Sequence, residues 1–222
     1  MLFYHESWDI MIIKDHGTHL FPDNTLEILN KSAAQQLKKK YTFQADPFLI
    51  EKDDKLYVFY EAFSFRNSKG TLRCRILDRE LTEIDDVKLE GFDDLRCHLS
   101  FPFLININNQ LFMIPESSER KEVLLFQSVE FPARWKKIKV LLSDTEVTDN
   151  IFLSINETCY LLSTTMDNKI IIHSAEHLHG QWQRITPTLK VSNHHHRGAG
   201  TPYLVDNKMY FLTQECTPET YG

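Results

Sequence analysis

Apolar and polar residues alternate in short runs along most of the chain, and the clearest example spans residues 46–61. An apolar run opens on Pro47, a polar turn covers residues 52–55, and an aromatic-rich run then continues to Glu61. Two apolar runs joined by a short polar turn are typical of a β-hairpin. Strand pairing would bring Asp46, just before the first strand, close to Glu61 at the end of the second.

The same hairpin pattern returns three times, with first runs that begin near residues 101, 150 and 201. Further strands are expected at residues 71–77, 123–129, 139–142, 169–174 and 182–185. A period near 50 residues built from about four strands predicts an all-β fold of the β-propeller type. A β-sandwich would also contain many short strands, but it would not repeat the same sequence motif at a fixed interval. The four copies can be aligned on the residue that follows the proline position. These residues are 55, 49 and 51 positions apart: Phe48, Phe103, Phe152 and Tyr203.

The first 45 residues do not follow this pattern. Residues 8–13 are apolar and β-branched and predict a lone strand. The spacing of Leu26, Leu29, Ala33 and Leu37 predicts a helix over residues 26–40, although the lysines at 38–40 would equally suit the end of a solvated loop.

We expect one domain over residues 1–222, with blades near 46–90, 101–143, 150–191 and 201–222 and with the strand at 8–13 closing the ring. The fourth copy stops at Tyr221 and Gly222, before its outer strands. A propeller must protect its edge strands. The sequence therefore predicts a fragment of a larger polypeptide, or a ring that stays open or closes through a partner.

Composition and charge exclude several classes of function. The net charge of −6 and the pI of about 5.9 argue against a nucleic-acid or anionic-membrane surface. No apolar run approaches the roughly 20 residues of a membrane helix, and Glu6 and Asp9 are atypical of a signal peptide. The scattered cysteines, without a C-x-x-C pair, indicate reduced thiols in a cytoplasmic protein. They are Cys74, Cys97, Cys159 and Cys216.

The repeat gathers polar residues at one end of the fold. In a propeller the first strand of each blade lines the central channel, so the residues before these strands converge, and the second strands return to the same face. The candidates are Asp46, His98, Asp149 and Arg197 near the first strands, and Glu61, Glu116 and Gln214 at the ends of the second. Such a set suits a polyhydroxylated or anionic ligand.

Paired carboxylates also suggest glycoside chemistry. The Asp46–Pro47 pair resembles the first blade of the five-bladed propeller glycosidases (arabinanases, xylosidases, invertases and levansucrases). That resemblance implies that Asp46 is the base or nucleophile and that Asp149 stands for the third-blade acid. The second-blade acid of those enzymes is replaced here by Phe101.

Each candidate also has a structural interpretation. Asp46 and Glu61 would serve as a strand cap and an edge charge, and His98 as a partly buried histidine. Three consecutive histidines, 194–196, precede Arg197, but they point in different directions and lack a partner spaced for zinc, so we predict no metal site. Arg197 alone would suit an anion. Without a nucleotide-binding motif we also predict no cofactor.

A second resemblance covers nearly the whole chain. Its phrases are E-S-W-D-I at 6–10, A-D-P-F at 45–48, H-L-S-F-P-F at 98–103, M-I-P-E-S-S at 113–118, F-P at 131–132 with Trp135, R-G-A-G at 197–200, Q-E-C at 214–216 and Y-G at 221–222. In this order they resemble the N-terminal domain family of plant glucosamine inositolphosphorylceramide transferases. The resemblance implies a five-bladed propeller in surface-glycan or glycolipid synthesis, with bacterial relatives beside or fused to formyltransferase or glycosyltransferase domains. Within these 222 residues we expect no such transferase domain.

Three hypotheses of function follow. The first is a carbohydrate-recognising propeller that binds a sugar, nucleotide sugar or lipid-linked glycan and works with a transferase. The second is a glycosidase or transglycosidase that uses Asp46 as base with Asp149 or Glu116 as acid. The third is a non-catalytic scaffold or a truncated remnant.

Overall fold

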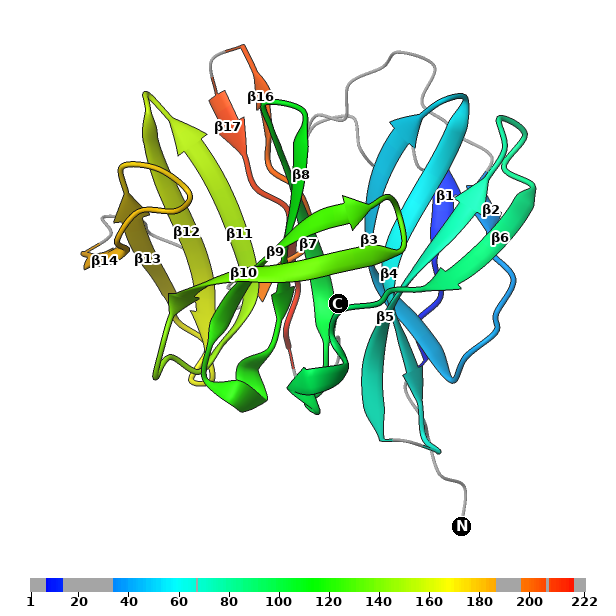
Figure 1. Cartoon of the computed structure of the whole chain (residues 1–222), viewed down its shortest axis with the longest axis horizontal. Coiled ribbons are helices and arrows are strands. Elements are labelled where there is room, and N and C mark those ends of the chain that lie inside the picture. The colour runs from blue at the N-terminus through cyan, green and yellow to red at the C-terminus, as the bar shows by residue number, and fades with distance from the viewer. Residues whose placement is uncertain (1–6, 14–33, 67, 187–196, 207, 218–222) are drawn as a thin grey trace.

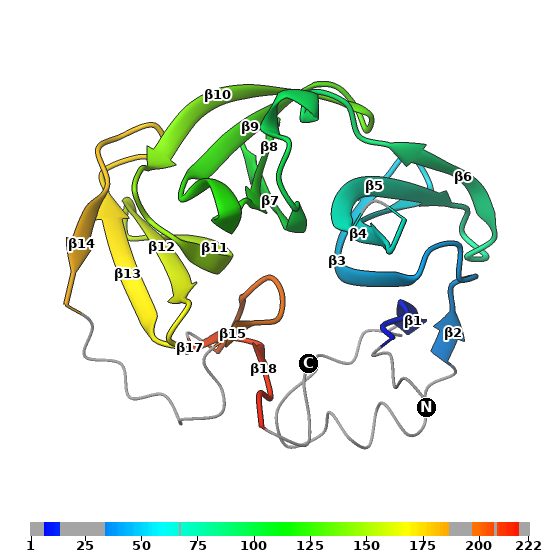
Figure 2. The ribbon, with the colours of Figure 1, turned by 90° about the horizontal axis from the view of Figure 1, so that it is seen from below.

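The fold is an all-β propeller, as the repeat predicts. The computed structural model describes residues 7–13, 34–66, 68–186, 197–206 and 208–217. Within these residues, three antiparallel sheets of four strands stand as blades around a common centre (Figure 1 and Figure 2). Helical structure in the described residues is limited to two 3₁₀ turns, η1 at Asp93–Leu95 and η2 at Ser118–Arg120. The number of five blades stays a prediction.

Each blade is a simple meander whose strands follow one another from the centre outward (Figure 2). The first blade contains β3 (Phe43–Lys52), β4 (Lys55–Ser64), β5 (Lys69–Leu77) and β6 (Glu83–Lys88). The second contains β7 (Ser100–Ile107), β8 (Gln110–Glu116), β9 (Val123–Glu130) and β10 (Arg134–Leu142). The third contains β11 (Val147–Ile155), β12 (Thr158–Thr165), β13 (Ile170–Ala175) and β14 (Gln183–Ile185).

The three inner hairpins turn in the same way. Two residues with positive φ connect the strands in each case: Asp53 and Asp54, Asn108 and Asn109, Asn156 and Glu157. Positive φ at both positions defines the type I′ turn, whose twist matches that of paired strands and which favours Asn and Asp. The repeated polar turns of the sequence therefore fix the hairpin register, and with it the residues that meet at the opposite end.

The predicted helix over residues 26–40 is wrong for the part that the structure describes. Residues 34–36 form strand β2 (Ala34–Gln36), which pairs with β1 (Met11–Ile13). Leu37 is buried against Ile10 and Ile12 on the face of the first blade. The apolar position at 37 thus reflects packing of an extended segment rather than a helical face. Residues 26–33 lie outside the described part.

The N-terminal segment lies against the first blade. The backbone N–H of Gln44, near the start of β3, donates a hydrogen bond to the carbonyl of Trp8. Ile10 and Ile12 pack with Val58 and Tyr60 of β4 on the face of this blade. The closing of the ring by residues 8–13 stays a prediction.

The fourth hairpin copy is less regular than the others. Strand β16 (Tyr203–Val205) pairs with β17 (Lys208–Tyr210), while β15 (Arg197–Gly198) pairs with β18 (Thr213–Gln214). The predicted second strand at 209–214 is therefore divided, because its two ends pair with different partners.

The core lies between the blades and is rich in aromatic side chains, among them Phe59, Phe101, Phe103 and Phe126. All four cysteines are free thiols, as the sequence predicts. Among the described residues there is no helix of the length and apolarity needed to span a bilayer.

Candidate functional site

The first strand of each blade is interrupted at the same place, by a bulge in its pairing with the second strand. The bulge residue has a φ of 52° at Asp46, 43° at Phe101 and 50° at Asp149. This left-handed conformation is tolerated by Asp but is unusual for a bulky residue. The first pair after the bulge involves Phe48, Phe103 and Ile151, so the alignment on Phe152 is wrong by one residue. Asp46, Phe101 and Asp149 are the equivalent positions.

The second strands deliver a further pair of acids. Glu61 is paired with Ala45, and Glu116 with Ser100, each one residue before the bulge position. The equivalent residue of the third blade is Thr164. Two neighbouring blades therefore each present a buried glutamate beside their bulge.

Asp46, Glu61 and Glu116 line one cavity of about 490 Å³ at the centre of the fold. This volume lies in the range of small-molecule sites. Six of the seven residues that the sequence singles out line it: Asp46, Glu61, His98, Glu116, Arg197 and Gln214. Asp149 lies instead on a smaller adjoining pocket, to which Arg197 also contributes.

Asp46 is partly buried, and its Oδ2 accepts a hydrogen bond from the backbone N–H of Phe101 at 3.2 Å. Burial raises the pKa of Asp46 to about 7, and the negative charges of Glu61, Asp149 and Glu116 add to the effect. Asp46 thus caps the bulge of the next blade and also lines the cavity.

Glu116 repeats this arrangement one blade further on. Its Oε2 accepts a hydrogen bond from the N–H of Asp149 at 3.3 Å, and its Oε1 accepts one from the Ser118 hydroxyl at 3.2 Å. Burial raises the pKa of Glu116 to about 7, together with the negative charge of Asp149. Two carboxyl groups whose pKa is raised to about 7 therefore line the cavity.

Glu61 lies against a histidine. Its Oε1 is 3.1 Å from Nε2 of His98, whose Nδ1 accepts a hydrogen bond from the N–H of Gly70 at 3.0 Å. Burial lowers the pKa of His98, but the proximity and charge of Glu61, with smaller effects of Glu116 and Glu119, outweigh burial and leave it raised. A Cβ on Gly70 would lie 2.4 Å from Oε1 of Glu61, so this close contact requires glycine.

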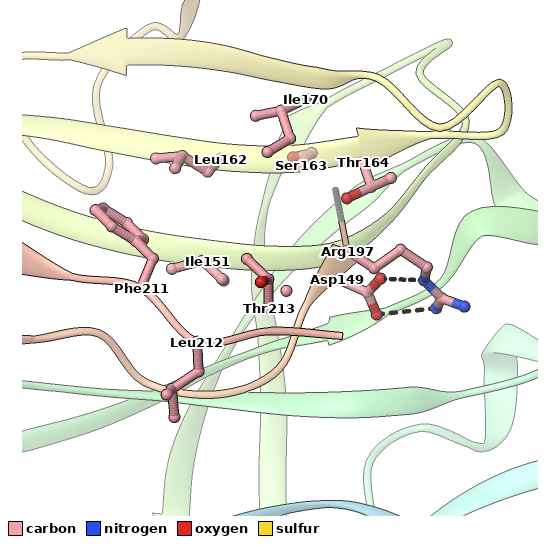
Figure 3. Close-up of a pocket in the computed structure, with 11 residues that line it drawn as sticks. Asp149, Ile151, Leu162, Ser163, Thr164, Ile170, Arg197, Phe211, Leu212 and Thr213 are labelled. Atoms are coloured by element: carbon pink, nitrogen blue, oxygen red, sulfur yellow. Dashed lines mark hydrogen bonds and ion pairs between the residues drawn. The ribbon is translucent and has the colours of Figure 1, made fainter. Parts of the chain in front are cut away.

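Asp149 is held by a bidentate ion pair. Arg197 donates from Nε to Oδ2 at 2.6 Å and from Nη2 to Oδ1 at 3.1 Å (Figure 3). The Asp149 side chain is 1% exposed. Burial raises its pKa, and the hydrogen bonds from Arg197 oppose that rise. A large part of the Arg197 charge is therefore neutralised inside the protein.

The adjoining pocket is small and apolar. Its volume is about 110 Å³, and Ile151, Leu162 and Ile170 of the third blade face Phe211 and Leu212 across it (Figure 3). The Asp149–Arg197 pair stands at its edge, between the apolar pocket and the central cavity.

Sequence reasoning missed Trp8 as a residue of the cavity wall, and it placed Gln44 at the cavity mouth without giving it a role. Trp8 lines the cavity and packs edge-on against Phe43 at 5.3 Å between ring centroids. Gln44 lines it as well and is fully buried; Arg75 donates to its Oε1, while its Nε2 has no hydrogen-bond partner among the residues that the structure describes. Both belong to phrases that carry the family resemblance or adjoin it, E-S-W-D-I and Q-A-D-P. A stronger signal for Trp8 was absent because its placement depends on the packing of the N-terminal segment, whereas Gln44 lies on β3.

A metal site finds no support in the described residues, which contain no group of three or more His, Cys, Asp or Glu able to hold an ion. The histidines at 194–196 lie outside the described part. The cavity instead combines carboxyl groups, an imidazole, an amide and an indole. Such a set can bind hydroxyl groups of a ligand and can exchange protons with it.

Solved structures with a similar fold include carbohydrate-active enzymes. One is the catalytic domain of an α-L-arabinofuranosidase of Coprinopsis cinerea, with a TM-score of 0.63, 10% identity, and 79% of this chain and 61% of that chain covered. Another is a β-xylosidase, with a TM-score of 0.64, 11% identity, and 85% and 72% covered. At this identity the likeness concerns the fold alone.

Sequence comparison is more specific. The model of the N-terminal region of glucosamine inositolphosphorylceramide transferase 1 matches residues 16–222. The transferase of that name from Arabidopsis thaliana is 30% identical over 191 residues, which cover 81% of this chain and 24% of the relative. The chain spans about a quarter of the length of the curated relatives it matches. With the family model matching most of its length, this chain belongs to the family of the N-terminal region of glucosamine inositolphosphorylceramide transferase 1.

Proposed function

We propose that this domain recognises a carbohydrate in the synthesis of a glycolipid or surface glycan and works alongside a transferase. The observation that carries the proposal is the central cavity, whose wall contains Asp46, Glu61, His98, Glu116, Arg197 and Gln214. Family membership supports the glycolipid context, since the relatives are named as transferases of this kind. The five blades and a cytoplasmic location belong to the same proposal.

The chemistry of the wall suits a sugar. Carboxyl groups at Asp46 and Glu116 accept hydrogen bonds from hydroxyls and donate when protonated. The indole of Trp8 offers an apolar face beside them, as sugar rings require on one side. The ligand would be a sugar, a nucleotide sugar or a lipid-linked glycan.

A glycan array with the purified chain tests this function. We expect binding to a limited set of glycans, lost in Asp46→Asn and Glu116→Gln. Asp54→Asn is the matched control, since Asp54 lies at the turn of the hairpin that carries Asp46 and its side chain is 72% exposed. Absence of binding to every sugar, nucleotide sugar and lipid-linked glycan would contradict the proposal and favour a scaffold.

A glycosidase or transglycosidase is the second candidate, favoured by one observation. Burial raises the pKa of Glu116 to about 7, which suits a general acid that works near neutral pH. Against it, Phe101 occupies the equivalent of Asp46 in the second blade, and both oxygens of Asp149 are bound by Arg197. Incubation with aryl glycosides and oligosaccharides separates the candidates: turnover that Asp46→Asn abolishes would establish the enzyme, and turnover unaffected by it would exclude Asp46 as the base.

A further inference from the structure

His98 lies on the wall of the central cavity, just before β7, and is held by contacts to the first and second blades. From the first blade, Gly70 donates its backbone N–H to Nδ1 of His98 at 3.0 Å and accepts the N–H of Leu99 at 3.2 Å. From the second blade, Oε2 of Glu119 accepts the backbone N–H of His98 at 3.1 Å. These contacts hold the imidazole in one position, with its Nε2 at 3.1 Å from Oε1 of Glu61.

The Gly70 contact decides which ring nitrogen of His98 carries the proton. A nitrogen that accepts a hydrogen bond must present a lone pair, so the proton of the neutral ring is on Nε2. Nε2 faces Glu61, whose carboxylate therefore accepts a charge-assisted hydrogen bond from it. A second proton on the ring would occupy Nδ1 and place two N–H groups against each other at Gly70. Burial opposes that second proton, whereas the charges of Glu61 on β4, Glu116 on β8 and Glu119 in η2 favour it.

The charge on Glu61 acts on Asp46 in the same cavity. The Glu61 side chain is only 6% exposed, so the hydrogen bond from His98 takes the place of water in stabilising its charge. After burial, the negative charge of Glu61 is the largest cause that raises the pKa of Asp46 to about 7. The wall thus combines a charged acceptor at Glu61 with an acid at Asp46 that donates when protonated. Environments that separate two carboxyl groups in this way are typical of functional sites.

We propose that His98 is a positioning residue of the cavity: its proton, fixed on Nε2 by the Gly70 N–H, holds Glu61 as the charged acceptor near Asp46. His98 acts through Glu61 and does not itself need to touch the ligand. This inference rests on the proposed carbohydrate recognition and deepens it, because it states which carboxyl group of the wall is the fixed acceptor and which is the donor for ligand hydroxyls.

NMR spectroscopy of the purified chain, without any ligand, tests the inference first. At about pH 9, well above the ordinary pKa of histidine, long-range proton–nitrogen correlations should show a proton on Nε2 of His98 and none on Nδ1. The carbon shift of the Asp46 carboxyl group, followed against pH, reports the charge on Glu61. Its midpoint should fall in Glu61→Gln, because the neighbouring negative charge is removed. A proton on Nδ1, or an Asp46 midpoint that Glu61→Gln leaves unchanged, would overturn the inference.

Two substitutions at His98 separate positioning from packing. His98→Gln places an amide N–H near the position of Nε2 and keeps a donor for Glu61, whereas His98→Asn places an oxygen near Nδ1 and keeps an acceptor for Gly70. We expect the glutamine variant to keep the Asp46 midpoint and the asparagine variant to lower it. His177→Asn, at an exposed histidine after β13, is the control, and circular dichroism and thermal melting verify folding. The opposite order, or equal midpoints in the two His98 variants, would overturn the positioning role.

Binding of a glycan selected on the array connects this role to the proposed function. We expect His98→Asn to weaken its affinity about tenfold, as the loss of a hydrogen bond to a charged group allows, and His98→Gln to stay within about threefold of the wild type. Equal losses in the two variants would overturn the positioning role and leave carbohydrate recognition standing. If no glycan binds, the proposed function fails, and the NMR titrations still decide the role of His98.

Discussion

The inner strands of the first and second blades have the same backbone and different chemistry at one position. Asp46 and Phe101 both sit in a bulge with a left-handed φ. Asp46 lines the cavity, whereas Phe101 is 1% exposed and packs edge-on against Phe48 at 4.9 Å. The bulge is thus a property of the blade, and the side chain placed there decides whether the position serves the ligand or the core.

The third blade offers a third use of the same position. Asp149 has the bulge conformation and the carboxyl group of Asp46, yet Arg197 binds both its oxygens. An acid at an equivalent position is therefore no proof of an equivalent role. The role of the acid depends on which side chains from other elements bind it, as Arg197 of β15 binds Asp149.

The largest effect is expected at this ion pair. Arg197→Gln leaves the Asp149 carboxylate buried without its counter-charge and should lower the free energy of unfolding by about 3–5 kcal/mol. Urea denaturation measures it. The double variant with Asp149→Asn removes both charges and should recover much of the loss. An Arg197→Gln variant as stable as the wild type would show that the pair carries no structural role.

Phe101→Ala should cost about 3 kcal/mol, because it empties a fully packed site between two blades. Asp46→Asn, at the equivalent position, should leave stability nearly unchanged while affecting ligand binding. Denaturation of the two variants in parallel checks the contrast. Phe65→Ala, at a side chain that is 54% exposed, is the control. A large loss of stability in Asp46→Asn would make that residue structural after all.

Gly70→Ala tests the close contact behind Glu61. The added Cβ would lie 2.4 Å from Oε1 of Glu61 and 2.6 Å from the carbonyl oxygen of Leu99, so strand or side chain must shift. We expect a loss of about 1–3 kcal/mol and a change in the titration of His98 followed by NMR. A variant with unchanged stability and an unchanged His98 pKa would show that the contact is readily relaxed.

The pH dependence of stability should follow the two protonated acids. The pKa of Asp46 and of Glu116 rises from 3.8 and 4.5 to about 7 on folding, so the folded state binds more protons over this interval. Stability should therefore fall as pH rises from about 4 to about 7. His98, with its raised pKa, acts in the same direction. Denaturation midpoints of Asp46→Asn and Glu116→Gln should depend less on pH than the wild type; unchanged slopes would contradict the assignment.

Local signals in the sequence predicted much of the fold. Period-2 alternation and the turns at residues 53–54 and 108–109 define the hairpins and so place Glu61 and Glu116 at one mouth. The sequence carries no sign of the bulge. The apparent repeat aligns Phe152 with Phe48, whereas the strand pairing makes Ile151, one residue earlier, the equivalent of Phe48. The helix prediction failed at residues 34–36, which form a strand. Leu37 fits helical spacing, but it is apolar because it packs against Ile10 and Ile12.

The sequence predicted which residues lie near the cavity better than it predicted which side chains contact one another. The convergence of inner strands brings Asp46, His98 and Arg197 to one place, as strand order requires. The Arg197–Asp149 pair joins β15 to β11 across 48 residues of sequence, and spacing carries no sign of it. Trp8 reaches the wall through the N-terminal segment, whose course the repeat does not specify.

Amide chemical shifts of the labelled protein, followed as a glycan that binds on the array is added, test the central claim most directly. The account predicts that the N–H of Phe101 shifts strongly, since it donates to Asp46, together with neighbouring amides at the inner bulges. Amides of the turns at residues 53–54, 108–109 and 156–157, at the opposite ends of the same hairpins, should stay unchanged. Shifts confined to those turns, or absent from Phe101 at saturation, would contradict the account.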